Sequence, residues 1–103
     1  MIAQLLEYAP HSVVIETIMR KTTGHICAFA IDSGEVMTEN ISRFDTFIQV
    51  IDGKAEIVIN DKSSLLQTGE SIIIPAHSRN TIKANERFKM LSTTIKSGYE
   101  ELA

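Results

Sequence analysis

Residues 45–60, DTFIQVIDGKAEIVIN, and residues 69–80, GESIIIPAHSRN, are the two stretches that decide the expected fold. The first stretch holds two apolar, β-branched runs on either side of Asp52-Gly53. This dipeptide suits the positive φ angles of a tight hairpin turn. The first stretch therefore predicts a β-hairpin made of Phe44–Ile51 and Lys54–Ile59.

The second stretch predicts a turn followed by a short, buried strand. Gly69 and Glu70 favour the turn, because glycine accepts a positive φ angle without steric cost. Three consecutive isoleucines then make Ser71–Ile74 a strand. Pro75 cannot donate a hydrogen bond to a sheet ladder, so it favours the end of that strand.

The rest of the chain continues this pattern of short strands between turn residues. Alternation in Ser12–Met19 places Val13, Ile15 and Met19 on one face of a strand. Further strands are expected at His25–Ile31, Asn80–Ala84 and Phe88–Ile95, and a short N-terminal helix at Ile2–Tyr8 is an option. The spacing predicts an all-β chain, folded as an antiparallel sandwich or barrel.

The composition limits the classes of function. Residues 1–103 are expected to form one domain, because most domains have roughly 50–250 residues. A net charge of −3 and a sequence isoelectric point near 5.5 argue against a nucleic-acid partner. The apolar runs are too short to cross a bilayer, and the first residues lack the basic start of a signal peptide. Cys27 is the one cysteine, so no internal disulfide can form and a cytoplasmic location is expected.

The glycine and proline positions resemble the paired motifs of the cupin superfamily. The first family motif places two histidines and a glutamate between two glycines. With Gly34 and Gly53 as those glycines, Asn40 and Ser42 stand at the histidine positions and Thr46 at the glutamate position. The resemblance implies a double-stranded β-helix, which is the jelly-roll barrel of that family.

The second cupin motif extends the resemblance to Ala84, so that it covers about half of the chain. Gly69 and Pro75 match the motif, whereas His77 replaces its second glycine and Asn80 stands at its histidine position. The scaffold residues are therefore kept, while most residues that bind the family's metal are replaced.

The replaced positions define a candidate pocket. By the resemblance, the pocket candidates face the barrel interior or its rim, and they are Asn40, Ser42, Thr46, His77 and Asn80. Neutral amides and hydroxyls suit hydrogen bonds to a small polar molecule. They suit transition metals poorly, because those ions favour imidazole, carboxylate and thiolate ligands. We therefore expect a small polar ligand, no metal and no cofactor.

Two further functions stay open from the sequence. His25, Cys27 and His77 could form a relocated metal site, with Asp45 or Glu39 as carboxylates, and His77 could act in general acid–base catalysis. The chain would then be a relocated-metal or metal-independent cupin enzyme, of isomerase, epimerase or oxygenase type. Whether it is an enzyme is left undecided.

The second open function is a structural module whose pocket is vestigial. Several strands are apolar on both faces, as in Phe44–Ile51, where Phe47 lies opposite Ile48 and Val50. A sheet that is buried on one face needs only one apolar face, so the other requires a cover. A homodimer is the expected cover, because self-complementary dimers are the commonest assemblies.

Overall fold

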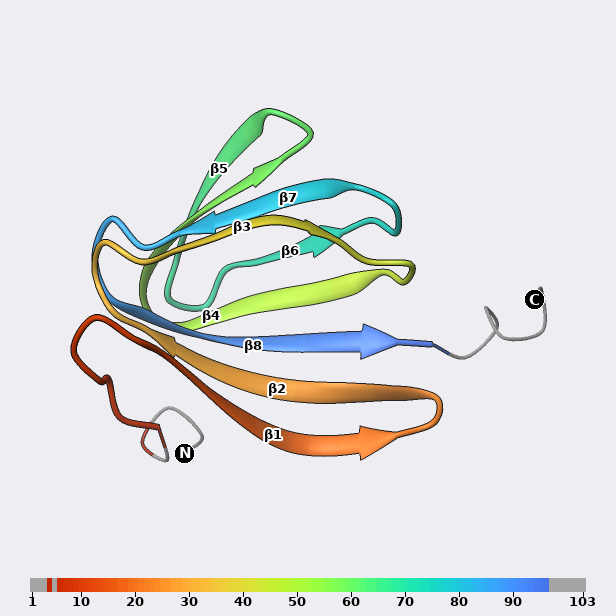
Figure 1. Ribbon diagram of the computed structural model, residues 1–103, viewed down its shortest axis with the longest axis horizontal. Coiled ribbons are helices and arrows are strands. Elements are labelled where there is room, and N and C mark those ends of the chain that lie inside the picture. Colours follow the sequence, from red (N-terminus) through yellow and green to blue (C-terminus); the bar gives the residue numbers. More distant parts are fainter. Residues whose placement is uncertain (1–3, 5, 97–103) are drawn as a thin grey trace.

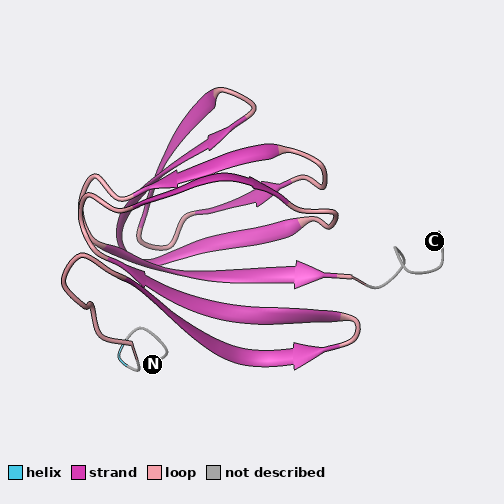
Figure 2. Cartoon of the chain, in the orientation of Figure 1, coloured by secondary structure: helices cyan, strands magenta, loops and turns pink. Residues whose placement is uncertain are grey.

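The computed structural model of the protein describes residue 4 and residues 6–96, apart from the side chains of residues 38–40. In this part of the chain the backbone forms eight strands (Figures 1 and 2). They are β1 (Val13–Lys21), β2 (Gly24–Ile31), β3 (Val36–Ile41), β4 (Thr46–Ile59), β5 (Lys62–Gln67), β6 (Ser71–Ile74), β7 (Arg79–Lys83) and β8 (Phe88–Ile95). The predicted all-β class is confirmed. The optional helix at Ile2–Tyr8 falls partly outside the described residues, and residues 6–8 are irregular.

All strand pairs are antiparallel, in the order β1-β2-β8-β4-β7-β3, and β5 and β6 also pair with β4. Figure 1 shows this sheet curled on itself, with β1 and β2 along one side and β7, β3 and β5 along the other. The result is the barrel that the strand spacing predicts. Among the described residues, no helix is long and apolar enough to cross a membrane.

The predicted hairpin turn at Asp52-Gly53 is wrong, because β4 continues through both residues. Residues 46–53 pair with β8, residues 54–59 pair with β5, and residues 56–59 also pair with β7. Gly53 has a φ of 87°, and a Cβ atom there would lie 2.5 Å from the carbonyl oxygen of Arg87. A bulge between Val50 and Asp52 bends the strand at the same place. Strand β4 therefore bends at Gly53. Before this bend it pairs in one half of the barrel wall, and after it in the other half.

The hairpin turn that does form lies at Asn60-Asp61 and joins β4 to β5. Both residues have positive φ angles, 48° and 70°, which asparagine and aspartate tolerate better than most residues. The sequence prediction missed β5 because its six residues contain only Leu65 and Leu66 as apolar side chains. A polar edge strand lacks the alternation that identifies a half-buried strand.

In strand β1 one predicted side-chain direction differs from the structure. Val13 and Ile15 lie in register with Ile31 and Phe29, on the inner face of the sheet. A bulge between Thr17 and Met19 then reverses the alternation, so that Met19 pairs with Ile26 on the outer face. The prediction that Met19 shares a face with Val13 and Ile15 is therefore wrong.

Apolar side chains pack on both faces of the curled sheet. The main core fills the barrel, and its largest fully buried members are Phe88, Ile31, Ile48, Ile57, Met90 and Val50. A smaller cluster lies on the outer face, where Leu6 packs against Ala28 and Ala30. The small alanine side chains of β2 leave room for the N-terminal segment. The phenolic hydroxyl of Tyr8 donates a hydrogen bond to Asp52 at 2.8 Å and holds this segment in place.

Candidate functional site

The inner face of the sheet is polar at one end of the barrel. Four side chains form a cross-strand row on β1, β2, β8 and β4, because each lies in register with the next: Arg20, His25, Thr94 and Thr46. The adjacent row on the same face contains Thr17, Cys27, Ser92 and Ile48. We call these two rows the polar end. It lies where β2 begins and β8 ends.

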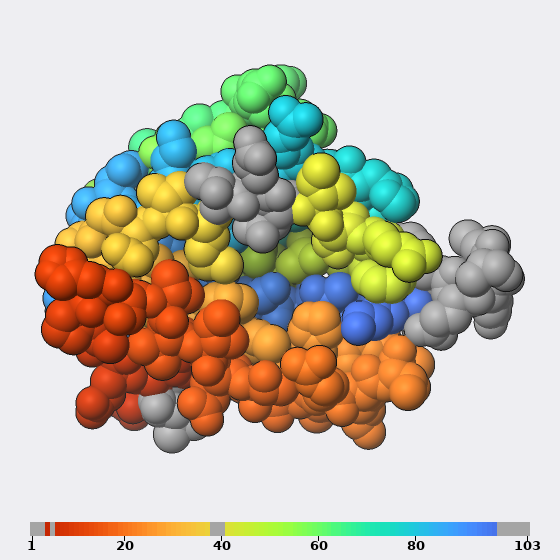
Figure 3. All heavy atoms as spheres, in the orientation of Figure 1, coloured from red at the N-terminus to blue at the C-terminus, as the bar shows by residue number. Residues whose placement is uncertain are grey.

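The rows beyond the polar end are apolar. Phe29, Met90 and Val50 lie in register in the third row, and Ile31 and Phe88 in the fourth. The hydroxyl, thiol and imidazole groups therefore stand above a packed aliphatic and aromatic floor. Figure 3 shows the blue atoms of β8 between the orange atoms of β1 and β2 and the yellow atoms of β3 and β4, so part of this inner face is reached from the front of the molecule.

His25 has a buried nitrogen that makes no hydrogen bond. Its Nδ1 atom is enclosed, and no partner for it occurs among the described residues. Burial, together with the nearby charges of Lys96 and Arg20, lowers the pKa of His25 below its ordinary value of 6.5. The imidazole is consequently neutral near pH 7, with one nitrogen that can donate and one that can accept. An unsatisfied polar atom in such a position suggests a missing partner.

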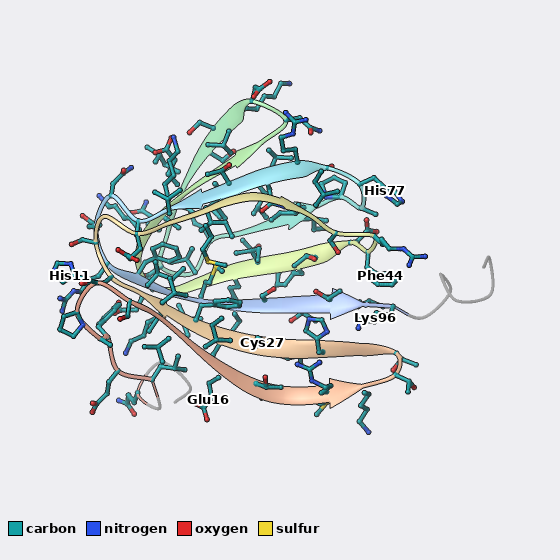
Figure 4. The ribbon with its side chains drawn as sticks, in the orientation of Figure 1. His11, Glu16, Cys27, Phe44, His77 and Lys96 are labelled. Carbon is teal, nitrogen blue, oxygen red and sulfur yellow. The ribbon has the colours of Figure 1, made fainter. Side chains whose placement is uncertain are left out.

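The other groups of the polar end are held by their neighbours. The hydroxyl oxygens of Thr46 and Thr94 lie 3.3 Å apart, within hydrogen-bond distance. The Cys27 sulfur and the Thr17 hydroxyl lie 3.9 Å apart (Cys27 is labelled in Figure 4), and Ser92 is buried beside Cys27. The polar end thus brings together several hydroxyl groups and one imidazole from four strands, β1, β2, β4 and β8.

The residues that the cupin resemblance predicts for the pocket lie in different places. Thr46 belongs to the polar end, and Asn80 is buried on the inner face of β7, in register with Ile59 of β4. Ser42 stabilises the turn before β4, because its hydroxyl accepts the Phe44 N–H at 3.1 Å. The side chain of Asn40 lies outside the described residues, although its backbone pairs with that of Asn80.

His77 lies on the outside, where Figure 4 shows it at the same end of the molecule as Phe44 and Lys96. It has a φ of 64°, and its N–H donates to the carbonyl oxygen of Ser42 at 2.7 Å. Its position in the second motif belongs to a glycine in the cupins, and the positive φ explains that preference. His77 lines an outer groove of about 240 Å³ together with Ile41, Asn60, Asp61 and Arg79.

The side chains do not fit the family's usual metal. Thr46, Ser42 and Asn80 supply neutral oxygen or amide groups at the positions of the family's ligands. Among the described residues, no three His, Cys, Asp or Glu side chains gather as a metal site requires. His25 and Cys27 face the barrel, whereas His77 is exposed on the outer groove. The Asp45 carboxylate accepts the Ala76 N–H at 2.8 Å, and the side chain of Glu39 is not described.

The sequence prediction missed four members of the site, which are Thr17, Arg20, Ser92 and Thr94, and it named His25 and Cys27 only as possible metal ligands. The alternation in Phe88–Ile95 is visible in the sequence, and so is the shared face of His25 and Cys27. No local signal shows which of the two faces of these strands points into the barrel. For Arg20, simple alternation from Val13 gives the wrong face, because the bulge in β1 shifts the alternation before this residue.

Solved structures of other proteins share this fold. A conserved protein of unknown function from Streptococcus pyogenes is 24% identical, with a TM-score of 0.89 over 93% of this chain and 84% of that chain. A cupin superfamily protein from Desulfitobacterium hafniense is 28% identical, with a TM-score of 0.87 over 90% of this chain and 85% of that one. A Cupin 2 conserved barrel domain protein from Leptotrichia buccalis is 25% identical, with a TM-score of 0.88 over 91% of this chain but only 46% of that one. No protein-family model and no curated protein matches the sequence.

Proposed function

Because the chain is a small cupin-domain protein, we propose that it binds a small polar molecule in the polar end of its barrel, through hydrogen bonds and without the family's usual metal. The observation that carries this proposal is the buried Nδ1 of His25, which has no partner among the described residues. Leaving such a group unsatisfied costs about 1–3 kcal/mol, which a bound ligand would recover.

The neighbours of His25 support a polar ligand. Thr94 and Thr46 continue its row, and both hydroxyl groups can donate or accept. Met90 and Val50 are apolar and buried, and they form the floor beneath these polar groups. A few placed polar groups over an apolar surface are typical of small-molecule sites.

A ligand screen by thermal shift tests this function. Sugars, polyols, carboxylates and nucleosides serve as the probes. We expect at least one class to raise the melting temperature, and we expect the rise to be lost in His25→Leu and Thr46→Val. His11→Leu is the matched control, because His11 lies on the surface at the opposite end of the molecule (Figure 4). No binding by any class, with a crystal structure in which side chains plug the polar end, would contradict the proposal.

A structural role as a homodimer is the second candidate, because one row of the outer face is apolar and exposed. The row runs across β1, β2, β8, β4 and β6, and its members lie in register: Met19, Ile26, Thr93, Phe47 and Ile73. Met19, Phe47 and Ile73 are 49%, 40% and 60% exposed. In a two-fold symmetric dimer, this row would pack against the same row of the second copy, and both rows would be buried.

Light scattering after size-exclusion chromatography tests the dimer. We expect a dimer at micromolar concentration, and a monomer after Phe47→Glu. The control is Leu65→Glu, which places the same charge on an exposed leucine of β5, outside the row. A wild-type monomer would contradict this candidate, and so would an equal effect of both substitutions.

A further inference from the structure

Two basic side chains approach His25 at the polar end. Arg20 lies in register with His25 on the inner face of the neighbouring strand. Lys96 follows β8 directly, and its backbone N–H donates to the carbonyl oxygen of Thr23, at the turn that leads into β2, over 2.7 Å. The charges of Lys96 and Arg20 both act on the imidazole and, after its burial, lower the pKa of His25. The polar end therefore combines neutral hydroxyl groups with two positive charges.

No carboxylate neutralises these charges in the described part of the chain. The one ion pair found there joins Arg87 to Asp32 at 3.3 Å, next to His11 and so at the opposite end of the barrel. The Lys96 ammonium lies 5.7 Å from the centre of the Phe44 ring, a contact that a cation makes without losing its charge. Figure 4 shows Lys96 beside Phe44, with Glu16 on a different side of the sheet.

The nearby acidic side chains that the structure describes face other partners. Glu16 pairs in register with Ala28, on the outer face, and Asp45 accepts a hydrogen bond from the backbone of Ala76. Among the described side chains no carboxylate pairs with these two cations, so together with the half-buried imidazole they form a positive site beside a hydrogen-bonding surface. A small anion complements both features, since charge-assisted hydrogen bonds are roughly twice as strong as neutral ones.

We infer that the ligand of the polar end is a small organic acid, whose carboxylate lies between Arg20, His25 and Lys96. The inference rests on the proposed function and adds the chemical class of the ligand. The guanidinium of Arg20 can hold a carboxylate with two parallel hydrogen bonds, and His25 can donate one more. A hydroxyl or carbonyl group of the acid then contacts Thr46, the half-buried threonine that ends the same row.

The size of the site favours a short acid over a polymer. Ser92 and Ile48 of the second row are already buried, so the ligand reaches only the first row and the start of the second. The net charge of −3 also opposes a long polyanion, which would be repelled by the rest of the surface.

The experiment compares acids with their neutral amides. Glycolate, lactate and malate are each titrated beside the corresponding amide at constant ionic strength, while the His25 ring signals are followed by nuclear magnetic resonance. We expect at least one acid to shift these signals in a saturable way. We expect its amide to bind about tenfold more weakly, since one favourable charge contact is worth roughly that factor.

Substitutions identify the groups that bind the acid. Arg20→Gln and Lys96→Gln should each raise the dissociation constant of the acid roughly three- to tenfold. Lys62→Gln removes the same charge from β5 and should leave the constant unchanged. Equal binding of acid and amide would overturn the inference but leave the proposed function intact. The absence of binding by every acid and amide would overturn both.

Discussion

The hydroxyl oxygens of Thr46 and Thr94 lie 3.3 Å apart across β4 and β8, at the position where the cupin motif has a metal-binding glutamate. Thr46 thus places a neutral hydroxyl at the glutamate position of the motif. Thr94 is only 6% exposed, so its hydroxyl depends on a partner inside the protein.

This pair allows a double-mutant test. Thr46→Val leaves the Thr94 hydroxyl without this partner, and we expect the free energy of unfolding to fall by about 1 kcal/mol. Thr46→Val combined with Thr94→Val should cost clearly less than the sum of the two single substitutions, because no hydroxyl then remains unpaired. Urea denaturation of all four proteins measures both quantities. Strictly additive costs would show that the two hydroxyl groups do not interact.

Because β4 bends at Gly53, we expect any substitution of this glycine to destabilise the protein. Gly53→Ala should destabilise the protein by about 2 kcal/mol or more, because the new methyl group would contact the carbonyl oxygen of Arg87 at an unfavourable φ angle. Gly34→Ala is the matched control, since Gly34 has a φ of 88° but no atom within 4 Å of a Cβ position. Its cost should stay near 1 kcal/mol, which is the cost of the angle alone. Thermal and urea unfolding compare the two variants, and equal costs would exclude the steric contact as the cause.

The left-handed backbone of His77 gives a prediction for the loop before β7. His77→Val should destabilise the protein by about 1–2 kcal/mol, because a β-branched residue fits a φ of 64° poorly. His77→Gly should not destabilise it, since glycine adopts this angle freely. Arg79→Val, on the neighbouring strand, provides the control and should change stability by no more than about 0.5 kcal/mol. If glycine at position 77 were as harmful as valine, the imidazole itself would be needed for folding.

The buried Asp32 should make the fold sensitive to acid. Its carboxylate accepts the His11 N–H at 2.8 Å, and this hydrogen bond, helped by one from the Ser33 backbone and by Arg87, lowers the pKa of Asp32 below its ordinary value. The stabilisation is therefore present above pH 4 and is lost as the pH falls from about 4 towards the folded-state pKa. Asp32→Asn should flatten this loss in urea titrations between pH 2 and 6. Asp61→Asn, at an exposed turn, should leave the curve as it is in the wild type.

The effect of the charges around His25 can be measured through the pKa of its imidazole. Because burial and the charges of Lys96 and Arg20 lower its pKa, the folded protein should bind a proton at His25 only below the ordinary value of 6.5. Lys96→Gln and Arg20→Gln should each move this pKa upward, towards the ordinary value, because each removes a repelling charge. Titration of the imidazole by nuclear magnetic resonance measures the shift, and Lys62→Gln should not change it. If neither variant raised the pKa, the two charges would be too far from His25 to share a ligand with it.

The sequence by itself determined the elements that depend on local chemistry. Ser71–Ile74 and Phe88–Ile95 have the predicted boundaries, because turn residues and a proline delimit runs of β-formers. The motif spacing also indicated which metal ligands are replaced, since that comparison needs only the identity of the residues. The resemblance to the cupin motifs implied the cupin fold.

Only the tertiary structure decided how these elements meet. Asp52-Gly53 has the backbone preference of a hairpin turn, yet the approach of Arg87 and Phe88 makes it a corner of one long strand. The inner face of β2 is set by its pairing with β8, and the bulge in β1 then directs Arg20 to that face. The site at His25 depends on these contacts between distant segments. A local sequence pattern shows which backbone angles a residue can adopt and which side chains share a face of a strand. Which angle is adopted, and which face is buried, depends on the neighbouring strands and is decided only when the sheet closes.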